Sequence, residues 1–490
     1  MKHKIILILA SILLAACQEK EPEDVKLSEG PKLLSTDPAN GTSEVKGEKL
    51  TLILTFDQNI KCPVQQQALV SIDGDARIES VNAYMTDLTI KVIDLAPGNV
   101  YSICIPKGTV QGFRQNQEGS KEINFSFSTK ETVVSQDYVL NPVETLVNPN
   151  ATRQAKNLYD FLLEMRGEKI LSGIQSSASS KNDMVNLVHE KTGKYPALAG
   201  YDFIFLHYSP TPDSWSWQQN YNDISDIKEH WDNHGLVAYT WHWNVPDSKA
   251  AWDRGLSEGK FDDYAFYTSS TSFDINEALN PGTWQNDFIM KDIEEVAGYL
   301  KLMQDEGIPV LWRPLHEAAG NYDLYGSNGA WFWWGKGGAE PCKKLWKLLY
   351  DQLVNVHGLN NLIWVWTVDV TKGAEDQYLD WYPGNEFVDI VGVDIYEDNT
   401  GAKHRQHKAL IDITKGTKLI TISECGNIPD PAETWKCEHQ WSWFMVWSST
   451  DSDGNPSLYS DGWSLNTEAY WNKVMSNPYV LNRSQIPSLK

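Results

Sequence analysis

Between residues 169 and 447 the chain repeats one pattern eight times, and this repeat limits its fold more than any other feature. Each repeat contains a short apolar segment that predicts a buried strand, and several are followed by an amphipathic run that predicts a helix. Strands that alternate with helices favour a parallel sheet, and eight such units close a (β/α)8 barrel, the TIM-barrel fold. The expected strands lie at 169–175, 196–202, 235–242, 308–317, 361–367, 388–396, 418–424 and 441–447.

An open, doubly wound sheet is the structural alternative, because it has the same order of strands and helices. No GxGxxG or P-loop motif opens a helix here, so the usual nucleotide-binding signature of that fold is missing. Amphipathic runs at 287–305, 342–356 and 403–414 separate the expected strands. Two long segments, 246–284 and 319–329, follow the third and fourth strands. Loops in that position lie on the catalytic face of a barrel, so we expect them to build a cleft.

Residues 31–130 have a different character, because short alternating strands and turn-forming residues repeat there. The alternation is clearest at 50–56 and 123–128. A segment of this kind predicts a small all-β Ig-like sandwich ahead of the barrel. The stretch 36–41 also resembles bacterial Ig-like modules. Since all 21 tryptophans lie between Trp215 and Trp471, we expect the sandwich to be a spacer, with carbohydrate binding as the alternative.

The first 17 residues resemble the signal peptide of a bacterial lipoprotein and are left out of the fold. Two lysines precede an apolar run at 5–14 that is too short to span a bilayer as a helix. The run ends in the sequence LAAC, which resembles a lipobox and implies cleavage before Cys17 and lipidation of that residue. An ordinary secretory signal is the alternative. Acidic residues after Cys17 resemble surface-export tags, so we expect a lipid anchor in a bacterial outer membrane, at the cell surface or the periplasmic face.

The segments between these parts are polar. Residues 18–30 are acidic, which is typical of a flexible tether, and 131–150 contain proline and asparagine, which is typical of a linker. The expected organisation is a signal peptide at 1–17, a tether at 18–30, a sandwich at 31–130, a linker at 131–150 and a barrel domain at 151–490.

Charge and cysteine content exclude several classes of function. The net charge of −23 argues against a nucleic-acid partner, because the phosphate backbone would be repelled. An odd number of cysteines remains after Cys17, which leaves at least one free thiol in an exported protein. The pairings Cys62–Cys104 and Cys425–Cys437 stay open. No Cys/His cluster has the spacing of a zinc site, and the chemistry considered below requires no metal or cofactor.

Two of the expected strands end in a glutamate. The segment 308–317 closes with Arg313, His316 and Glu317, and the segment 418–424 closes with Glu424. The carboxyl ends of barrel strands meet at one mouth, so we expect both carboxylates there. Two carboxyl groups about 5–5.5 Å apart suit a retaining glycoside hydrolase, in which one is the nucleophile and the other the acid and base. A separation of about 6.5–9.5 Å suits an inverting enzyme.

Other chemistries can be compared with this one. A zinc protease motif, HExxH, would need histidine where the chain has Gly320, and no GxSxG elbow of a serine hydrolase is present. Cys425 has no partnering histidine motif, so a buried structural thiol explains it better than a nucleophile. The tryptophan clusters at 241–243 and 331–334 are candidate floors for sugar rings, whose C–H faces stack on indole.

Three motifs resemble glycoside hydrolase family 26, a family of retaining (β/α)8 enzymes dominated by endo-β-mannanases. They are WRPLHE at 312–317 with WFWWG at 331–335, VDIY at 393–396 and ISE at 422–424, within a match that covers about residues 150–480. The resemblance implies that Glu317 is the acid/base and Glu424 the nucleophile. The other candidate site residues are Tyr396 near the nucleophile, His242, His316, Trp331, Trp334 and Trp447 at the substrate, and Arg313 and Asp394 in support.

The predicted function is a retaining endo-β-1,4-mannanase that cuts mannan-type plant polysaccharide or manno-oligosaccharides by double displacement. Residues 318–330 separate Glu317 from Trp331 and depart from the compact family pattern, which indicates a remodelled cleft. An exo-acting enzyme that releases mannobiose, a β-1,3-xylanase and a mixed-linkage glucanase are therefore alternatives on the same scaffold. A non-catalytic glycan-binding surface lipoprotein is the alternative from another class, although such a protein has no need of two convergent carboxylates.

Overall fold

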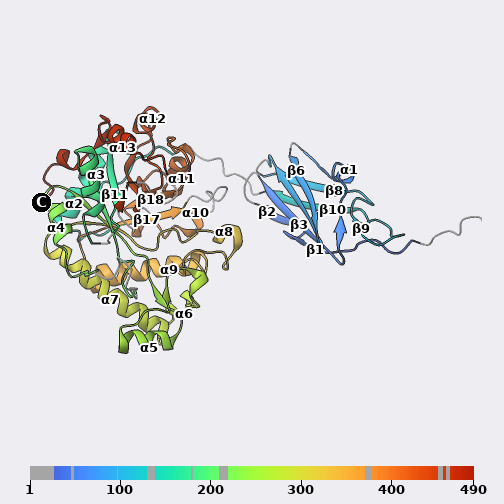
Figure 1. Ribbon diagram of the computed structural model, residues 1–490, viewed down its shortest axis with the longest axis horizontal. Helices are drawn as coiled ribbons and strands as arrows, with labels where there is room; N and C mark the ends of the chain where they lie inside the picture. The colour runs from blue at the N-terminus through green and yellow to red at the C-terminus, as the bar shows by residue number, and fades with distance from the viewer. Residues whose placement is uncertain are drawn as a thin grey trace, which may run out of the picture. The chain divides into compact units, whose positions relative to one another are not determined.

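The computed structural model describes residues 27–45, 49–74, 76–95, 98–129, 138–177, 180–208, 219–369, 378–450, 456–458 and 464–490. The chain divides into two compact units, with the boundary between Val134 and Ser135 (Figure 1). The expected signal peptide, Cys17 and most of the tether lie outside the described residues.

The N-terminal unit is the predicted sandwich. Its two four-stranded sheets have the orders β1-β3-β7-β6 and β2-β10-β8-β5. Alternate residues of the strands point inward, as Leu52 and Leu54 of β3 and Phe125 and Phe127 of β10 show, and the two inner faces share one core. The elements are β1 (Leu33–Asp37), β2 (Thr42–Val45), β3 (Leu50–Phe56), β4 (Ile60–Lys61), α1 (Val64–Gln67), β5 (Ser71–Ile72), β6 (Arg77–Tyr84), β7 (Asp87–Ile93), β8 (Val100–Ile105), β9 (Gln111–Gly112) and β10 (Ile123–Thr129).

The C-terminal unit is the predicted barrel. Eight parallel strands follow one another around it, and the circle closes because β11 pairs with both β12 and β20. Each strand falls on one of the eight predicted segments, and all of their residues are buried, as expected for a sheet covered on both faces. The strands are β11 (Ile170–Gln175), β12 (Leu198–Asp202), β13 (Leu236–Thr240), β16 (Val310–Arg313), β17 (Leu362–Asp369), β18 (Ile390–Ile395), β19 (Leu419–Cys425) and β20 (Trp441–Val446).

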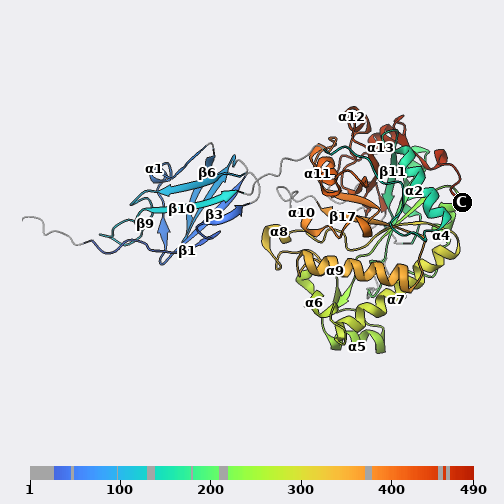
Figure 2. The ribbon, with the colours of Figure 1, turned by 180° about the vertical axis from the view of Figure 1, so that it is seen from behind.

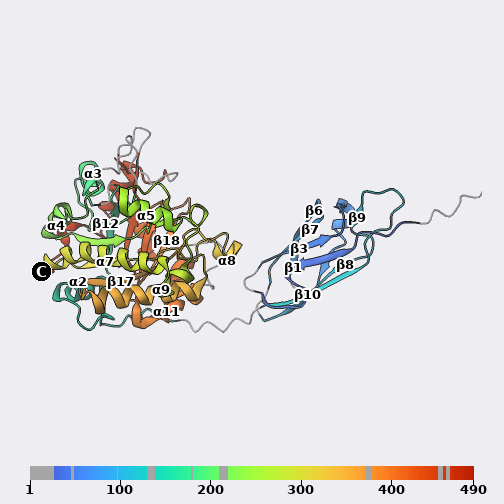
Figure 3. The same ribbon diagram turned by 90° about the horizontal axis from the view of Figure 1, so that it is seen from below.

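Helices surround the barrel strands in all three views (Figures 1, 2 and 3). The longest of those described, α7, begins at Trp284, where Thr283 caps it by accepting a hydrogen bond from the backbone N–H of Asn286, and it buries Ile289, Ile293 and other apolar residues on one face. The helices are α2 (Arg153–Met165), α3 (Asp183–Thr192), α4 (Ser225–Asp232), α7 (Trp284–Asp305), α9 (Ala339–Tyr350) with the π-helical turn η3 (Asp351–Val356), α10 (Tyr378–Trp381), α11 (His404–Thr414), α12 (Pro431–Lys436) and α13 (Glu468–Met475).

The two predicted inserts carry short elements of their own. Residues 246–284 hold, in order, α5 (Lys249–Glu258), β15 (Tyr264–Ala265), η2 (Thr268–Ser270) and α6 (Ile275–Ala278), and β15 pairs with β14 (Val245–Pro246). Helix α5 packs beside α7 (Figure 3), and the second insert carries α8 (Tyr322–Tyr325). Small remaining elements are β21 (Ser449–Thr450), β22 (Pro456–Ser457), η5 (Asn385–Phe387), β23 (Val480–Leu481) and η6 (Arg483–Gln485).

The segment 138–150, predicted as part of a linker, packs against the barrel. Leu140 belongs to the barrel's hydrophobic core, and the hydroxyl of Tyr159 donates a hydrogen bond to the carbonyl of Val143 at 2.9 Å. The backbone N–H of Val147 donates to Asp389 at 2.7 Å. Polar, proline-containing composition does not reveal such contacts.

The described residues also bear on cysteines and on membrane spans. Cys62, Cys104, Cys342, Cys425 and Cys437 are free thiols, so neither candidate disulfide is formed. Within the described ranges, none of the helices combines the length and the apolar character that crossing a bilayer requires.

Candidate active site

The structure brings the two predicted catalytic glutamates together at the C-terminal end of the barrel strands. Glu424 lies near the end of β19, and Glu317 lies in the turn that follows β16. Carboxylate oxygens of Glu317, Glu424 and Asp394 lie within 4.8 Å of one another. An oxygen–oxygen separation of no more than 4.8 Å is compatible with the separation of about 5–5.5 Å in retaining glycosidases and shorter than the range of about 6.5–9.5 Å in inverting ones. The pair therefore has the geometry for a nucleophile and an acid/base.

An unusual backbone conformation places Glu317 at the mouth. Its φ is +51°, in the left-handed region that non-glycine residues rarely adopt, and Leu315 two residues earlier has φ +49°. The backbone N–H of Glu317 donates to the carbonyl of Thr367 on β17 at 3.1 Å, and its carbonyl accepts from Gly320. Such conformations cost of order 1–3 kcal/mol and persist where the surrounding structure holds them. The left-handed conformations of Leu315 and Glu317 therefore define the turn that carries Glu317.

The environment of Glu317 favours its protonated form. Burial raises its pKa well above the usual value, and the negative charges of Asp394 and Glu424 raise it further. A hydrogen bond joins the side chains of Glu317 and Asp394, so the proton of Glu317 has an acceptor. A carboxylic acid that keeps its proton is what the general acid of a glycosidase requires.

Glu424 has the opposite surroundings, because two donors face it. The guanidinium of Arg313 forms an ion pair with Glu424, and the hydroxyl of Tyr396 donates to its other oxygen at 2.8 Å. Arg313 is buried and also binds Asp394 at 3.1 Å. Burial opposes the charge of Arg313, but the adjacent carboxylates outweigh that effect and raise its pKa. Hydrogen bonds and a positive charge stabilise the ionised carboxylate that a nucleophile needs.

Two buried histidines contact each other beside the turn that carries Glu317. The Nε2 atoms of His242 and His316 lie 3.2 Å apart, and Nδ1 of His242 lies 2.6 Å from Asp202. Burial lowers the pKa of His316 well below its usual value, and His242 and Arg313 lower it further, so His316 is neutral at pH 7. Asp202 was not predicted from the sequence, although it ends the second expected strand and so lies where barrels place functional residues.

Three predicted aromatic residues present surface where a substrate could touch them. Trp331 is 36% exposed, Tyr396 is 37% exposed and Trp447 is half-buried. The ring of Trp447 contacts that of His242 edge to face, with centroids 5.6 Å apart. Of these residues, Tyr396 contacts Glu424 directly, and Trp447 packs on His242, which in turn contacts His316.

The other predicted sugar-stacking tryptophans are buried, and that prediction was wrong for them. Trp334 is 0% exposed, and its indole N–H donates to the carbonyl of His316 at 2.9 Å. Trp241 and Trp243 are also buried and stack on each other with centroids 3.9 Å apart. These buried rings have no exposed face for a sugar, and Trp334 instead holds the backbone of His316. Periodicity could not separate them from Trp331, because both kinds of tryptophan follow barrel strands.

Tyr267 is a further candidate that the sequence analysis missed. It is 50% exposed, and its ring stacks on Phe332 with centroids 5.7 Å apart. Burial of its hydroxyl raises the pKa of Tyr267, and the charge of Glu317 raises it further, which places the phenol near the acid/base candidate. The only signal in the sequence was its place in the insert 246–284, and that insert offered many other residues.

The extra residues 318–330 leave Trp331 beside Glu317. The backbone N–H of Gly320 donates to the carbonyl of Glu317 at 2.9 Å, and the carbonyl of Gly320 accepts from the N–H of Trp331 at 3.0 Å. A Cβ on Gly320 would lie 2.5 Å from the indole of Trp331, so glycine is required for this approach. Both ends of the insert therefore meet at Gly320. As a result, Trp331 lies close to Glu317 in space, although the two residues are separated in the sequence.

Comparison with known proteins agrees with this geometry. A (β/α)8 barrel with two facing carboxylates at the ends of its strands is an arrangement typical of glycoside hydrolases. The chain belongs to glycosyl hydrolase family 26, whose family model matches residues 147–485. A bacterial Ig-like domain model matches residues 28–129.

Individual relatives are similar over the same region. The chain is 35% identical over 356 residues to mannan endo-1,4-beta-mannosidase A of Piromyces sp, a match that covers 71% of this chain and 51% of that protein. It is also 35% identical over 349 residues to a mannan endo-1,4-beta-mannosidase of Thermothelomyces thermophilus, covering 70% of this chain and 63% of that protein. The chain thus matches about half to two thirds of the length of these curated relatives.

Two solved structures are similar in fold and sequence. One is the family 26 domain of an endo-beta-mannanase/endo-beta-glucanase from Prevotella bryantii, with a TM-score of 0.60, 34% identity, and coverage of 70% of this chain and 99% of that one. The other is a beta-mannanase from a symbiotic protist of the termite Reticulitermes speratus, complexed with gluco-manno-oligosaccharide. It has a TM-score of 0.57, 32% identity, and coverage of 71% of this chain and 99% of that one.

Proposed function

We propose that this protein is a retaining endo-β-1,4-mannanase with Glu424 as nucleophile and Glu317 as acid/base. The observation that carries the proposal is the pair of carboxylates with oxygens within 4.8 Å, one facing Arg313 and Tyr396 and the other in surroundings that raise its pKa. Membership of family 26 and relatives named as mannan endo-1,4-beta-mannosidases support the choice of β-mannan as substrate.

The proposed reaction has two displacements at one carbon atom. In the first, a carboxylate oxygen of Glu424 bonds to the anomeric carbon while the bond to the glycosidic oxygen breaks and Glu317 gives that oxygen its proton. In the second, the ionised Glu317 takes a proton from water, whose oxygen attacks the same carbon and displaces Glu424. Both glutamates end in their starting states, and two inversions give net retention of the β configuration.

The first test is product analysis on linear β-mannan with the mature chain. We expect a ladder of manno-oligosaccharides, and proton NMR during the first minutes should show the newly formed reducing ends as the β anomer. Release of mannobiose alone would indicate an exo-acting enzyme instead of an endo-acting one. An initial α anomer would contradict retention. No release from mannan would contradict the specificity, and xylan and mixed-linkage glucan would then be the substrates to examine.

A second test separates an enzyme from a glycan-binding protein. We expect Glu424→Gln to lower kcat by several orders of magnitude while mannohexaose still binds. The matched control is Glu433→Gln, since Glu433 is exposed on α12 and the change removes the same charge. Equal turnover by both variants would exclude Glu424 as the nucleophile. Binding without turnover by the unchanged chain would favour the glycan-binding alternative.

We further propose that the protein is a lipoprotein, anchored through Cys17 to a bacterial outer membrane. The lipobox-like LAAC at residues 14–17 and the acidic residues that follow support this proposal. In a Gram-negative host we expect the full chain to enter the membrane fraction and to incorporate labelled fatty acid. Cys17→Ser should abolish both, whereas Cys437→Ser should change neither. An unchanged membrane fraction in Cys17→Ser would contradict the anchor.

A further inference from the structure

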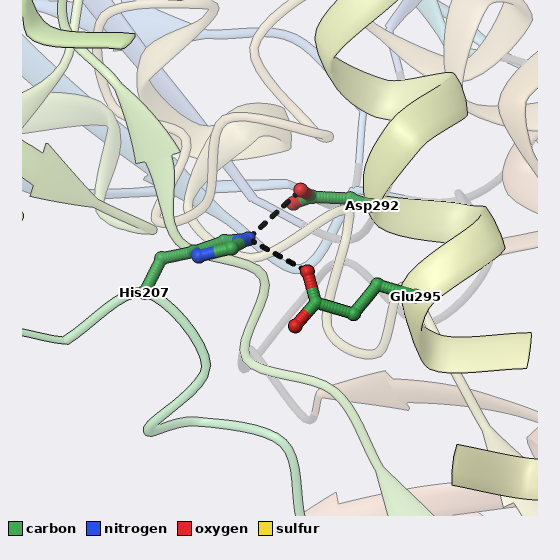
Figure 4. A group of neighbouring side chains, drawn as sticks. All are labelled: His207, Asp292 and Glu295. Carbon is green, nitrogen blue, oxygen red and sulfur yellow. Dashed lines mark hydrogen bonds and ion pairs between the residues drawn. The ribbon is translucent and has the colours of Figure 1, made fainter. Parts of the chain in front are cut away.

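A second cluster of ionisable side chains lies apart from the carboxylate pair. His207 is in the loop after β12, and Asp292 and Glu295 are three residues apart on one face of α7. Figure 4 shows the three side chains pointing toward one another, with the imidazole nitrogen of His207 directed between the two carboxylates. The proposed reaction uses none of these residues.

The distances between the potential ligand atoms of the cluster fit a metal ion of the size of Zn²⁺. Nε2 of His207 lies 2.9 Å from Oδ1 of Asp292 and 3.8 Å from Oε2 of Glu295, and one potential ligand atom from each residue lies within 4.8 Å of the others. Zinc bonds nitrogen and carboxylate oxygen at about 2.0–2.1 Å, so neighbouring ligand atoms of a tetrahedron lie about 3.4 Å apart. The two distances from His207 lie on either side of that value.

Asp292 is oriented as ligands in metal sites usually are. It is 2% exposed, and its second oxygen, Oδ2, accepts a hydrogen bond from the indole N–H of Trp243 at 2.8 Å. This contact leaves Oδ1 directed at His207. An outer hydrogen bond that fixes a ligating carboxylate is a regular feature of metal sites. Glu295 has a side chain that is 35% exposed, so an ion and water can reach the cluster from its side.

The cluster holds more acidic than basic groups. With both carboxylates ionised, the three side chains carry a net charge of −2 when His207 is neutral and −1 when it is protonated. Burying an unbalanced charge is costly, and the imidazole of His207 is enclosed by the rings of Phe261, Tyr264 and Phe288 at 5.1, 5.8 and 6.1 Å. A divalent cation would neutralise both carboxylates.

We propose that His207, Asp292 and Glu295 bind one divalent transition-metal ion of the Zn²⁺ type, with water completing its coordination. Imidazole with carboxylates is a ligand set that suits zinc and its neighbours in the first transition series. The ion joins the loop after β12 to α7, the helix that follows the insert 246–284. Its role is structural, because it fixes two segments that flank the catalytic face and does not contact Glu317 or Glu424.

Zinc binding by the full chain tests the proposal. After treatment with a chelator and dialysis, we expect calorimetric titration with Zn²⁺ alone to show one equivalent that Glu295→Gln loses or binds at least about 10-fold more weakly. His207→Gln should have the same effect. The matched control is Glu294→Gln, which removes an exposed carboxylate one residue away on the same helix and should bind like the unchanged chain. Circular dichroism checks that each variant is folded.

Two further measurements do not depend on catalysis. Saturating Zn²⁺ should raise the Tm of the unchanged chain and of Glu294→Gln and leave that of Glu295→Gln unchanged, because a ligand that binds only the folded state stabilises it. Co²⁺ should give visible absorption bands that Glu295→Gln lacks. Absence of zinc binding by the unchanged chain, or equal binding by Glu294→Gln and Glu295→Gln, would overturn the proposal and leave the cluster as an ion pair of His207 with the two carboxylates.

Discussion

Trp334 donates its indole N–H to the backbone carbonyl of His316 at 2.9 Å, so a fully buried tryptophan fixes the residue that precedes the candidate acid/base. Trp331, three residues earlier, is 36% exposed and bonds through its backbone to Gly320. The two tryptophans of one short motif therefore have different tasks, one in support of the site and one at its surface.

This difference predicts that Trp334→Phe and Trp331→Phe affect different properties of the protein. The first removes the donor to a buried carbonyl and should lower the free energy of unfolding by about 1–3 kcal/mol, with a fall in kcat. The second should leave stability nearly unchanged and raise KM for mannan, since a smaller ring offers less stacking area. Urea unfolding and steady-state kinetics measure both. A raised KM with unchanged stability in Trp334→Phe would show that Trp334 contacts substrate.

Glu317→Ala should affect substrates according to their leaving groups. General acid catalysis contributes about 10²–10⁴-fold, so turnover of mannan should fall by that factor, while an aryl β-mannobioside with a good leaving group needs little protonation and should lose much less. Comparing kcat/KM on the two substrates measures the difference. Equal losses on both would count against Glu317 as the acid.

The raised pKa of Glu317 predicts the high-pH side of the activity profile. The protonated form is the active acid, so kcat/KM for mannan should fall as pH rises through the pKa of Glu317, which burial and the charges of Asp394 and Glu424 place well above its usual value. With an aryl β-mannobioside, Glu317→Ala should lack this decline. A profile that keeps the same decline in the variant would assign it to another group.

Tyr396→Phe should lower kcat more than it changes KM. The substitution removes the hydroxyl that donates to Glu424 at 2.8 Å and keeps the ring that is 37% exposed. A hydrogen bond to a charged group contributes about 1.5–3 kcal/mol, which corresponds to a loss of about 10- to 150-fold if it is made in the transition state. Kinetics on mannohexaose test this, and an effect confined to KM would assign Tyr396 to substrate contact alone.

Asp389 predicts a pH dependence of stability. Burial raises its pKa from 3.8 to about 6, although hydrogen bonds from the backbone N–H groups of Trp364 and Val147 oppose the rise. The folded state then holds a proton that the unfolded state releases near pH 4. The contribution of Asp389 to stability is therefore complete below about pH 4 and falls by about 3 kcal/mol as pH rises through 6.

Comparison with Asp389→Asn isolates that contribution. The asparagine variant is less stable at low pH, because it loses one acceptor, and its free energy of unfolding should decline less between pH 4 and 7. Asp160→Asn, on the exposed face of α2, is the control and should follow the unchanged chain. Parallel curves for all three proteins would contradict the raised pKa of Asp389.

The barrel strands and the two candidate glutamates were predicted from the sequence for the same reason. A fully buried parallel strand must be apolar along its length, so a charged residue at the end of such a run, as at Glu317 and Glu424, is conspicuous. The position of Asp202 at the end of β12 follows the same rule, but a single aspartate after a mixed segment was too weak a signal.

Side-chain direction in the loops was not predictable in this way. Trp331 and Trp334 have the same chemistry, and only the path of residues 318–330 decides which of them is exposed. Tyr267 lies in a long insert, and it contacts Phe332, which is far away in sequence. The packing of residues 138–150 on the barrel is likewise a long-range property that composition does not contain.

Residues 318–330 form a loop that closes at Gly320. This closure separates the length and composition of the loop from the positions of Glu317 and Trp331, which a shorter turn would link. Because both ends of this loop meet beside Glu317 and Trp331, its interior can change in length and composition while the acid and the stacking surface keep their positions. Selection, or a protein engineer, can therefore vary this loop without displacing the two residues that stand at its base.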